Sequence, residues 1–225
     1  MELDNLAAIR RARQGDDGVV RLMESTPQGA PNTLQLGVIF EGGLGVAAVA
    51  LAWLFGVPLR EQITGNAADL MSAVGRGCLA TAPMLVLFGL LIRSRWPPFR
   101  RLRRQVRQLV RHLIRDATLL DIAALSIVAG VGEELLFRGV IQPLAIRWTT
   151  PEVGLALASL LFGLAHAISR TYFILATVVS VYLGWLALYY GEIVTPIVTH
   201  ALYDFCVLWW ISRRWRANGT NAGAS

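Results

Sequence analysis

Long apolar runs separated by arginine-rich joints constrain this chain more than any other feature of its sequence. Of its 225 residues, 55% are hydrophobic and 16% are charged, whereas a soluble domain carries about 25% charged residues. A helix that spans a bilayer needs about 20 mostly apolar residues. Six segments approach this length and character: residues 36–57, 73–92, 117–146, 153–168, 172–190 and 194–211. The composition excludes a soluble globule, a disordered chain and a disulfide-stapled secreted module.

Helices are the expected form of these runs. Backbone groups in lipid must be hydrogen-bonded within the protein, and the runs are too long and too uniformly apolar for barrel strands. We therefore predict an all-α fold: a polytopic membrane helix bundle of about six transmembrane helices plus an amphipathic surface helix. The expected domains are a polar N-terminal segment over 1–35, a transmembrane domain over 36–211 and a polar tail over 212–225.

Nine arginines and no acidic residue occupy the joint from Arg93 to Arg115. Apolar residues interleave with them at helical spacing, and Pro97 and Pro98 mark the start of a helix. This pattern is typical of an amphipathic helix on the membrane surface, with arginines that reach lipid phosphates. We expect anionic lipid, not nucleic acid, to be the partner of residues 94–115.

The arginines also predict an orientation. Six crossings put seventeen of the 21 basic residues on the side of the joint and only Arg60 and Arg147 on the opposite side. Because cytoplasmic loops carry the excess of basic residues, we expect both termini in the cytoplasm. The expected location is the inner (cytoplasmic) membrane.

Ionisable side chains inside the expected spans are the candidate functional residues, since they are costly in lipid unless they are paired or functional. The third run contains Glu133, Glu134 and Arg138. Glu134 and Arg138 are one helical turn apart, with the acid toward the N-terminus, which favours an ion pair. Glu133 has no such partner in its own helix.

Two histidines complete the candidate set. His166 lies near the end of the fourth run, and His200 lies one turn before Asp204 in the sixth. A single histidine in a membrane helix is commonly a packing residue. Two histidines, a glutamate pair, an arginine and an aspartate on three spans are much harder to explain by packing, and they indicate a functional site.

Three short motifs connect these residues. EExxxR runs from Glu133 to Arg138, FxxxH from Phe162 to His166, and HxxxD from His200 to Asp204. In this order they resemble the signature of the CPBP family, the CAAX proteases and bacteriocin-processing enzymes, also called the ABI family. The resemblance covers about residues 117–211, the expected protease core.

The resemblance implies a glutamate-type intramembrane endopeptidase. Its substrate would be membrane-associated: a CAAX-like tail, a leader peptide or a C-terminal sorting signal. By the same resemblance, Glu133 activates the hydrolytic water with His166 as its partner, and His200 and Asp204 stabilise the oxyanion.

Three further residues have supporting roles by the same resemblance: Glu134 and Arg138 form an ion pair, and Phe162 accompanies the motif histidine. Asp204 departs from the family pattern, which often has Asn at this position. A carboxylate cannot donate a hydrogen bond unless it is protonated. We therefore expect Asp204 to orient His200 rather than contact the oxyanion.

The sequence leaves open whether a metal is bound and whether the protein is an enzyme. Glu133, His166 and His200 could together bind zinc, but the chain has no HExxH motif, and we expect metal to be dispensable. A non-catalytic immunity or scaffold protein of the same fold is the main alternative to an enzyme, and intact motif positions speak against it. A transporter could also use buried acids, but no inverted repeat or pair of broken helices supports one.

Two placements within the membrane are also predicted. Glu41, in the first run, is expected near the headgroup boundary. Glu133 lies about 22 Å along its run at 1.5 Å per residue, whereas His166 lies near the cytoplasmic end of the fourth run. The two can meet only if a helix bends or a span boundary is shifted. The candidate positions for a bend are Gly130, Gly132, Gly139 and Pro143.

Overall fold

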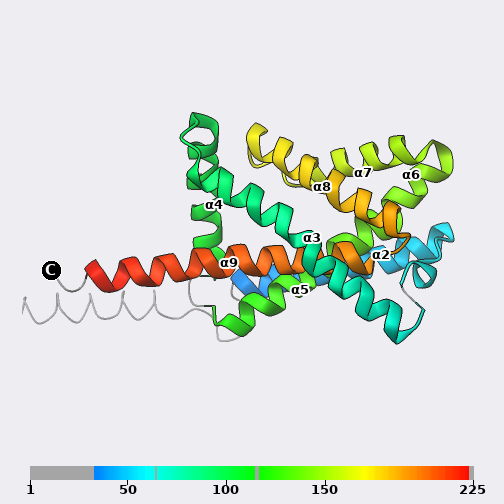
Figure 1. The fold of residues 1–225 in the computed structure, drawn as a ribbon, viewed down its shortest axis with the longest axis horizontal. Helices are drawn as coiled ribbons and strands as arrows, with labels where there is room; N and C mark the ends of the chain where they lie inside the picture. The colour runs from blue at the N-terminus through cyan, green and yellow to red at the C-terminus, as the bar shows by residue number, and fades with distance from the viewer. Residues whose placement is uncertain (1–32, 64, 115–116, 223–225) are drawn as a thin grey trace, which may run out of the picture. The chain divides into compact units, whose positions relative to one another are not determined.

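The structure, a computed structural model, describes residues 33–63, 65–114 and 117–222. The regular structure of these residues is entirely helical, which confirms the all-α fold class (Figure 1). The expected N-terminal segment up to residue 32, Arg115 and residues 223–225 lie outside the described residues. The elements are α2 (Thr33–Phe55), η1 (Leu59–Gln62), α3 (Ala67–Arg93), α4 (Pro97–Ile114), α5 (Leu119–Leu136), η2 (Phe137–Ile141), α6 (Gln142–Trp148), α7 (Pro151–Ala165), α8 (Arg170–Tyr190) and α9 (Val194–Ala222).

Local sequence determines where several of these helices begin and end. Thr118 and Asp121 form a capping box at the start of α5, each accepting a backbone N–H of the other. Ser169 accepts the backbone N–H of Tyr172 at the start of α8. Gly191 ends that helix with φ +68°, a left-handed conformation that glycine adopts without steric cost.

Among the described residues, four helices are long and apolar enough to span a membrane: α2, α3, α8 and the Val194–Arg214 part of α9. Large apolar side chains lie exposed on their outer faces; Trp53 is 85% exposed and Leu79 is 78% exposed. A soluble protein would bury such residues, whereas lipid solvates them. The described part of the chain is therefore a helical membrane bundle.

The third and fourth expected spans are built differently. The expected run 117–146 consists of α5, a π-helical segment η2 and the short helix α6. Helix α7 has 15 residues, about 22 Å at 1.5 Å per residue, so it is shorter than the hydrocarbon core of about 30 Å. It ends at Ala165, three residues before the expected boundary.

The expected surface helix is α4, and it begins at Pro97 as predicted. Figure 1 shows α4 crossing the bundle at one end, roughly at right angles to the long helices. Helix α9 continues to Ala222, so most of the segment expected as a polar tail from residue 212 is helical.

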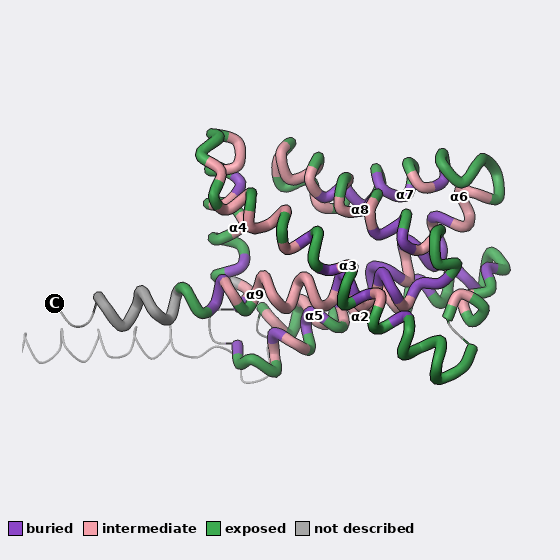
Figure 2. The backbone as a smooth tube through the Cα atoms, in the orientation of Figure 1, coloured by how far each residue is buried: buried purple, intermediate pink, exposed green. Residues whose placement is uncertain are grey.

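Helix α5 is at the centre of the packing, between α2 and α9. A Cβ atom on Gly132 would lie 2.3 Å from the carbonyl oxygen of Glu41 in α2, and one on Gly130 would lie 2.8 Å from Cβ of Ala201 in α9. These glycines let the three backbones approach closely, as small residues do between membrane helices. Figure 2 shows buried residues gathered around α5 and η2.

Candidate active site

The predicted site residues come from three parts of the bundle and meet in its interior. Glu133 and Glu134 lie on the last turn of α5, and Arg138 follows in η2. His166 caps the C-terminus of α7, and His200 and Asp204 lie on α9. The sequence placed Glu133 and His166 at different depths of the membrane. In the structure α7 is short and ends at Ala165, and His166 lies next to Glu133.

Glu133 lies between two imidazole rings. Its Oε1 is 3.6 Å from Nε2 of His166, and its Oε2 is 3.9 Å from Nε2 of His200. The side chain is 8% exposed, and among the described residues Oε2 has no hydrogen-bond partner. A buried acceptor without a partner is uncommon in a folded protein, and here it lies near the His200 imidazole, which can exchange protons.

Glu134 forms the connection between Arg138 and His200. Its Oε1 accepts a hydrogen bond from Nη1 of Arg138 at 2.9 Å and another from Nδ1 of His200 at 2.8 Å. Arg138 also donates from Nη2 to both the carbonyl and the hydroxyl oxygen of Ser180 in α8, each at 2.9 Å. The guanidinium is thus paired and hydrogen-bonded, as a buried charge must be.

Asp204 lies farther from His200 than the expected orienting role requires. Its Oδ2 is 3.6 Å from Nε2 of His200, beyond ordinary hydrogen-bond length. The hydrogen bond that fixes His200 goes from Nδ1 to Glu134 instead. Side-chain spacing within α9 favoured Asp204, but the ring turns toward α5 in the packed bundle. The Asp204 side chain is 31% exposed, whereas that of His200 is 9% exposed.

His166 is fixed by the turn that precedes it. Nδ1 donates to the carbonyl oxygen of Phe162 at 2.9 Å, because a carbonyl can only accept. The imidazole stacks on the Phe162 ring with centroids 4.3 Å apart and 18° between the planes. The Arg138 guanidinium lies 4.9 Å from the centre of the same ring. Nε2 of His166 is thereby directed at Glu133.

Glu41 lies beside the candidate site, a position that the sequence did not indicate. It was expected near the headgroup boundary, but its backbone oxygen lies against Gly132, the residue before Glu133. Glu41 shares the helix face of Ala48 and Ala52, which are buried, and its carboxylate interacts electrostatically with Glu133. Its Oε2 is buried without a hydrogen-bond partner among the described residues. No motif marks this helix, so only the packing of α2 on α5 identifies Glu41.

The metal expectation has a geometric test. Among the described residues, no group of three or more His, Cys, Asp or Glu side chains is arranged to hold a metal ion. Glu133, His166 and His200, the set considered for zinc, face one another directly, with each Nε2 within 4 Å of a Glu133 oxygen. The chemistry proposed below uses the protein groups alone.

Comparison with known proteins bears on this site. Residues 115–206 match the family model described as type II CAAX prenyl endopeptidase, Rce1-like. This segment is similar to the CAAX protease family. The match extends from the start of α5 into α9 and contains all three motifs, which confirms the resemblance drawn from the sequence. No curated protein and no solved structure matches the chain.

CAAX proteases cleave membrane-associated peptides, so the match supports membrane endopeptidase activity in general terms. The matched segment includes Glu133, His166, His200 and Asp204 but not Glu41. Glu41, whose carboxylate interacts electrostatically with Glu133, lies on a helix outside the family match.

Proposed function

We propose that this protein is an intramembrane endopeptidase of the glutamate type, which hydrolyses a peptide bond with water activated by Glu133 and His166. The observation that carries the proposal is the environment of Glu133. It is a buried carboxylate with an unpartnered oxygen, flanked by the Nε2 atoms of two fixed imidazoles at 3.6 and 3.9 Å. General-base catalysis needs an acceptor within reach of the attacking water.

In the first step, Glu133 takes a proton from water while the water oxygen bonds to the scissile carbonyl carbon. His166 supports this step because its Nδ1 is occupied by Phe162 and its Nε2 faces Oε1 of Glu133. The pair can therefore hold the water and its proton between them. A positioned base of this kind contributes about 10²–10⁴-fold to the rate.

The same step produces a negative charge on the carbonyl oxygen, and His200 is the proposed donor to it. Because Nδ1 of His200 donates to Glu134, a proton on Nε2 makes the ring an imidazolium with an N–H free for the oxyanion. Glu134 and Asp204 lie at 2.8 and 3.6 Å from the ring nitrogens and balance its charge. A preorganised donor of this kind stabilises the tetrahedral intermediate.

In the second step, the intermediate breaks its carbon–nitrogen bond. The departing nitrogen takes the proton that Glu133 received from water, so Glu133 returns to the carboxylate form. The products are one new carboxyl group and one new amine, and no atom of the protein is consumed.

Substrate approaches from the side of His166 and Asp204. These side chains are 26% and 31% exposed, whereas the side chain of Glu134 is fully buried. A peptide that reaches Glu133 therefore passes the His166–Asp204 side. We propose a membrane-associated peptide as substrate: a CAAX-like tail, a leader peptide or a C-terminal sorting signal.

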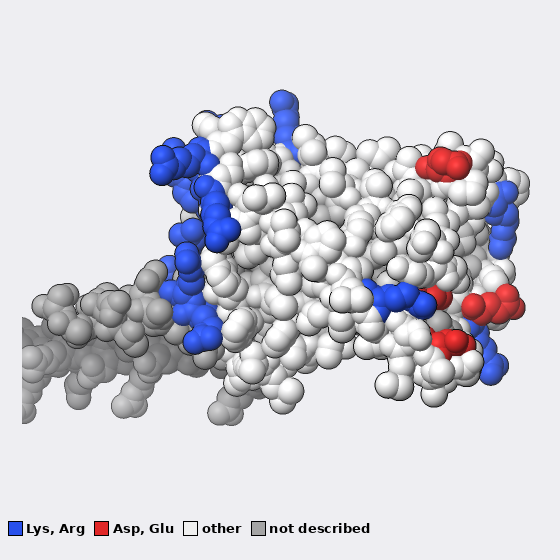
Figure 3. Space-filling view, viewed as in Figure 1, with Lys and Arg blue, Asp and Glu red and all other residues white. Residues whose placement is uncertain are grey.

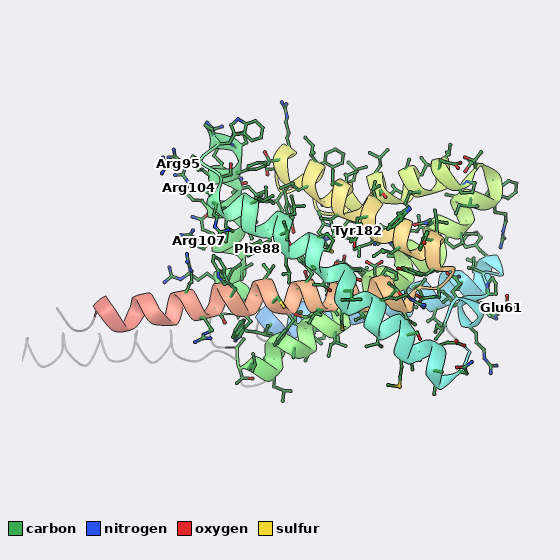
Figure 4. All side chains as sticks on the ribbon, in the orientation of Figure 1. Glu61, Phe88, Arg95, Arg104, Arg107 and Tyr182 are labelled. Carbon is green, nitrogen blue, oxygen red and sulfur yellow. The ribbon has the colours of Figure 1, made fainter. Side chains whose placement is uncertain are left out.

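We also propose that the end of the bundle with α4 faces the cytoplasm. Figure 4 shows Arg95, Arg104 and Arg107 at this end and Glu61 at the opposite end. In a variant without Cys78 and Cys206, a membrane-impermeant thiol reagent applied outside should label Arg60→Cys and spare Arg104→Cys. The reverse pattern would contradict the orientation.

The function is tested by comparing the protein termini in membranes and secreted fractions of two strains. One strain expresses the wild type, and the other expresses Glu133→Gln at the same level. We expect a defined set of new termini that is lost in Glu133→Gln and retained in a Glu61→Gln control, because the Glu61 side chain is exposed on η1. Identical termini in all strains would favour a non-catalytic immunity or scaffold protein instead.

A further inference from the structure

One end of the described bundle carries an exposed surface of a single charge sign. We call it the basic surface; it comprises the exposed arginines of α3, the α3–α4 joint, α4 and α9. Figure 3 shows basic side chains along this end, and Figure 4 shows Arg95, Arg104 and Arg107 pointing away from the bundle. Residues 93–114 contain no acidic residue. The members are Arg93, Arg95, Arg100, Arg101, Arg104, Arg107, Arg111, Arg213 and Arg214.

The apolar face of α4 fixes the direction of these arginines. Leu102, Val110 and Ile114 are buried at helical spacing, and the last two belong to an apolar cluster with residues of α5 and α9. The arginines occupy the opposite face. Because α4 crosses the bundle at its end (Figure 1), that face lies where the ends of the long helices reach the lipid headgroups.

Arg103 differs from its neighbours. It is half-buried, and its Nη1 donates to the carbonyl oxygens of Leu91 and Ser94 at 2.7 and 2.8 Å. It thereby satisfies carbonyl groups at the C-terminal end of α3. Arg103 is a structural residue of the α3–α4 joint and is not part of the basic surface.

Helix α9 adds two arginines that are supported by aromatic rings. The Arg213 guanidinium lies 5.1 Å from the ring centre of Trp209, and that of Arg214 lies 4.5 Å from the ring centre of Trp210. The four side chains line a surface hollow of about 340 Å³. Val194–Arg214 has 21 residues, about 31 Å of helix, so the hollow lies one bilayer thickness from the start of α9.

The opposite end of the bundle has no comparable surface among the described residues. Its exposed charges are of both signs, with Arg60 and Glu61 adjacent in η1 and Asp69 at the start of α3. A mixed surface attracts neither sign of charge strongly, whereas clustered arginines attract anions at the membrane surface.

We propose that the basic surface binds the phosphate groups of anionic phospholipids in the membrane leaflet that faces α4. Arginine suits this ligand because its planar guanidinium donates two parallel hydrogen bonds to phosphate oxygens. Tryptophan beside arginine is typical of the headgroup layer. Because the basic surface lies at the ends of the membrane-spanning helices, lipid headgroups are within its reach, and this favours lipid over nucleic acid as the ligand. The interaction is independent of the peptidase reaction.

The test is the melting temperature of the full-length protein in detergent, titrated with phosphatidylglycerol or with phosphatidylcholine of the same acyl chains. We expect phosphatidylglycerol to raise the melting temperature of the wild type more than phosphatidylcholine does, and 0.5 M salt to remove the difference. An equal effect of the two lipids on the wild type would overturn the proposal.

A charge variant locates the interaction. Replacement of Arg100, Arg104, Arg107 and Arg111 by glutamine keeps helix propensity and leaves Arg103 in place. Each arginine near an anionic surface contributes about fivefold to binding, so the half-maximal concentration of phosphatidylglycerol should rise at least about fivefold. Arg60→Gln, at the opposite end, should leave it unchanged.

Two outcomes would contradict the assignment of the surface. One is an undiminished preference for phosphatidylglycerol in the four-arginine variant. The other is an oligonucleotide that stabilises the wild type as much as phosphatidylglycerol does, which would assign the surface to nucleic acid. The comparison of the two lipids on the wild type keeps the test valid even if the variant does not fold.

Discussion

Nδ1 of His200 lies 2.8 Å from Oε1 of Glu134, the same oxygen that accepts the hydrogen bond of Arg138. One carboxylate thus neutralises a buried arginine and orients the histidine proposed to bind the oxyanion. The supporting ion pair and the active site are therefore physically connected through a single atom. Substitutions at Glu134 act on stability and on catalysis at once.

The first prediction concerns Glu134→Gln. The Arg138 guanidinium would keep its hydrogen bonds to Ser180 but lose its counter-charge in the bundle interior. Loss of one partner of a buried ion pair costs about 3–5 kcal/mol, so we expect a clearly lower melting temperature in detergent. Activity should fall with it because His200 loses the negative charge that balances its imidazolium form. An unchanged melting temperature would mean that the pair does not stabilise the bundle.

The second prediction separates Asp204 from Glu134. Since Glu134 fixes His200 and Asp204 lies 3.6 Å from Nε2, Asp204→Asn should retain activity within about tenfold of the wild type. Asp204→Leu removes the polar group beside the proposed oxyanion donor and should cost about 10–100-fold in kcat. The measurement is single-turnover cleavage of one substrate by both variants at equal folded concentration. Equal activity of both variants and the wild type would exclude Asp204 from the site.

The third prediction is that replacing Glu41 does not lower the melting temperature, whereas replacing Glu134 does. Glu41 has a buried oxygen without a hydrogen-bond partner in the described part of the chain, and it faces another carboxylate, Glu133. Such a group is costly in an apolar interior. We therefore expect Glu41→Gln to leave the melting temperature unchanged or to raise it. The corresponding gain in the free energy of unfolding would be at most about 1 kcal/mol. A melting temperature lowered as strongly as in Glu134→Gln would show that Glu41 is a structural partner.

The fourth prediction tests the contact that brings α2 to Glu133. In Gly132→Ala the new methyl group would overlap the carbonyl oxygen of Glu41, so the helices must separate, at a cost of about 1–3 kcal/mol. Activity should fall because Glu133 is the next residue. Gly43→Ala is the matched control, since a Cβ there has nothing within 4 Å, and it should leave both stability and activity unchanged.

Much of the fold could be predicted from the sequence because a helix that spans lipid must be long and apolar. Apolar length defines a span, and the expected run 172–190 agrees with α8 at Arg170–Tyr190. The rule gives the position of an apolar run but not the residue at which a helix ends. Helix α7 ends at Ala165, and no feature of the apolar run 153–168 indicates this end.

The site was predicted in part for a similar reason. The motif residues on three spans could be recognised from the sequence because they are ionisable residues in apolar runs. In the structure, each lies within 4 Å of another. Which of them pair was not predictable. Spacing within α9 favoured His200 with Asp204, but the bond to Glu134 crosses between helices that are 66 residues apart in the chain. The position of Glu41 beside Glu133 was not predicted because the packing of α2 on α5 leaves no pattern in the sequence.

The role of Glu133 is tested most directly by Glu133→Gln in single-turnover cleavage, with a substrate identified from the comparison of termini. Glutamine keeps the size of the side chain and cannot accept a proton from water. Glu133 has no ion-pair partner as close as that of Glu134, so the variant should fold. We expect a melting temperature close to that of the wild type and a cleavage rate lower by about 10²–10⁴-fold. Cleavage within tenfold of the wild-type rate by the folded variant would contradict the assignment of Glu133 as the general base.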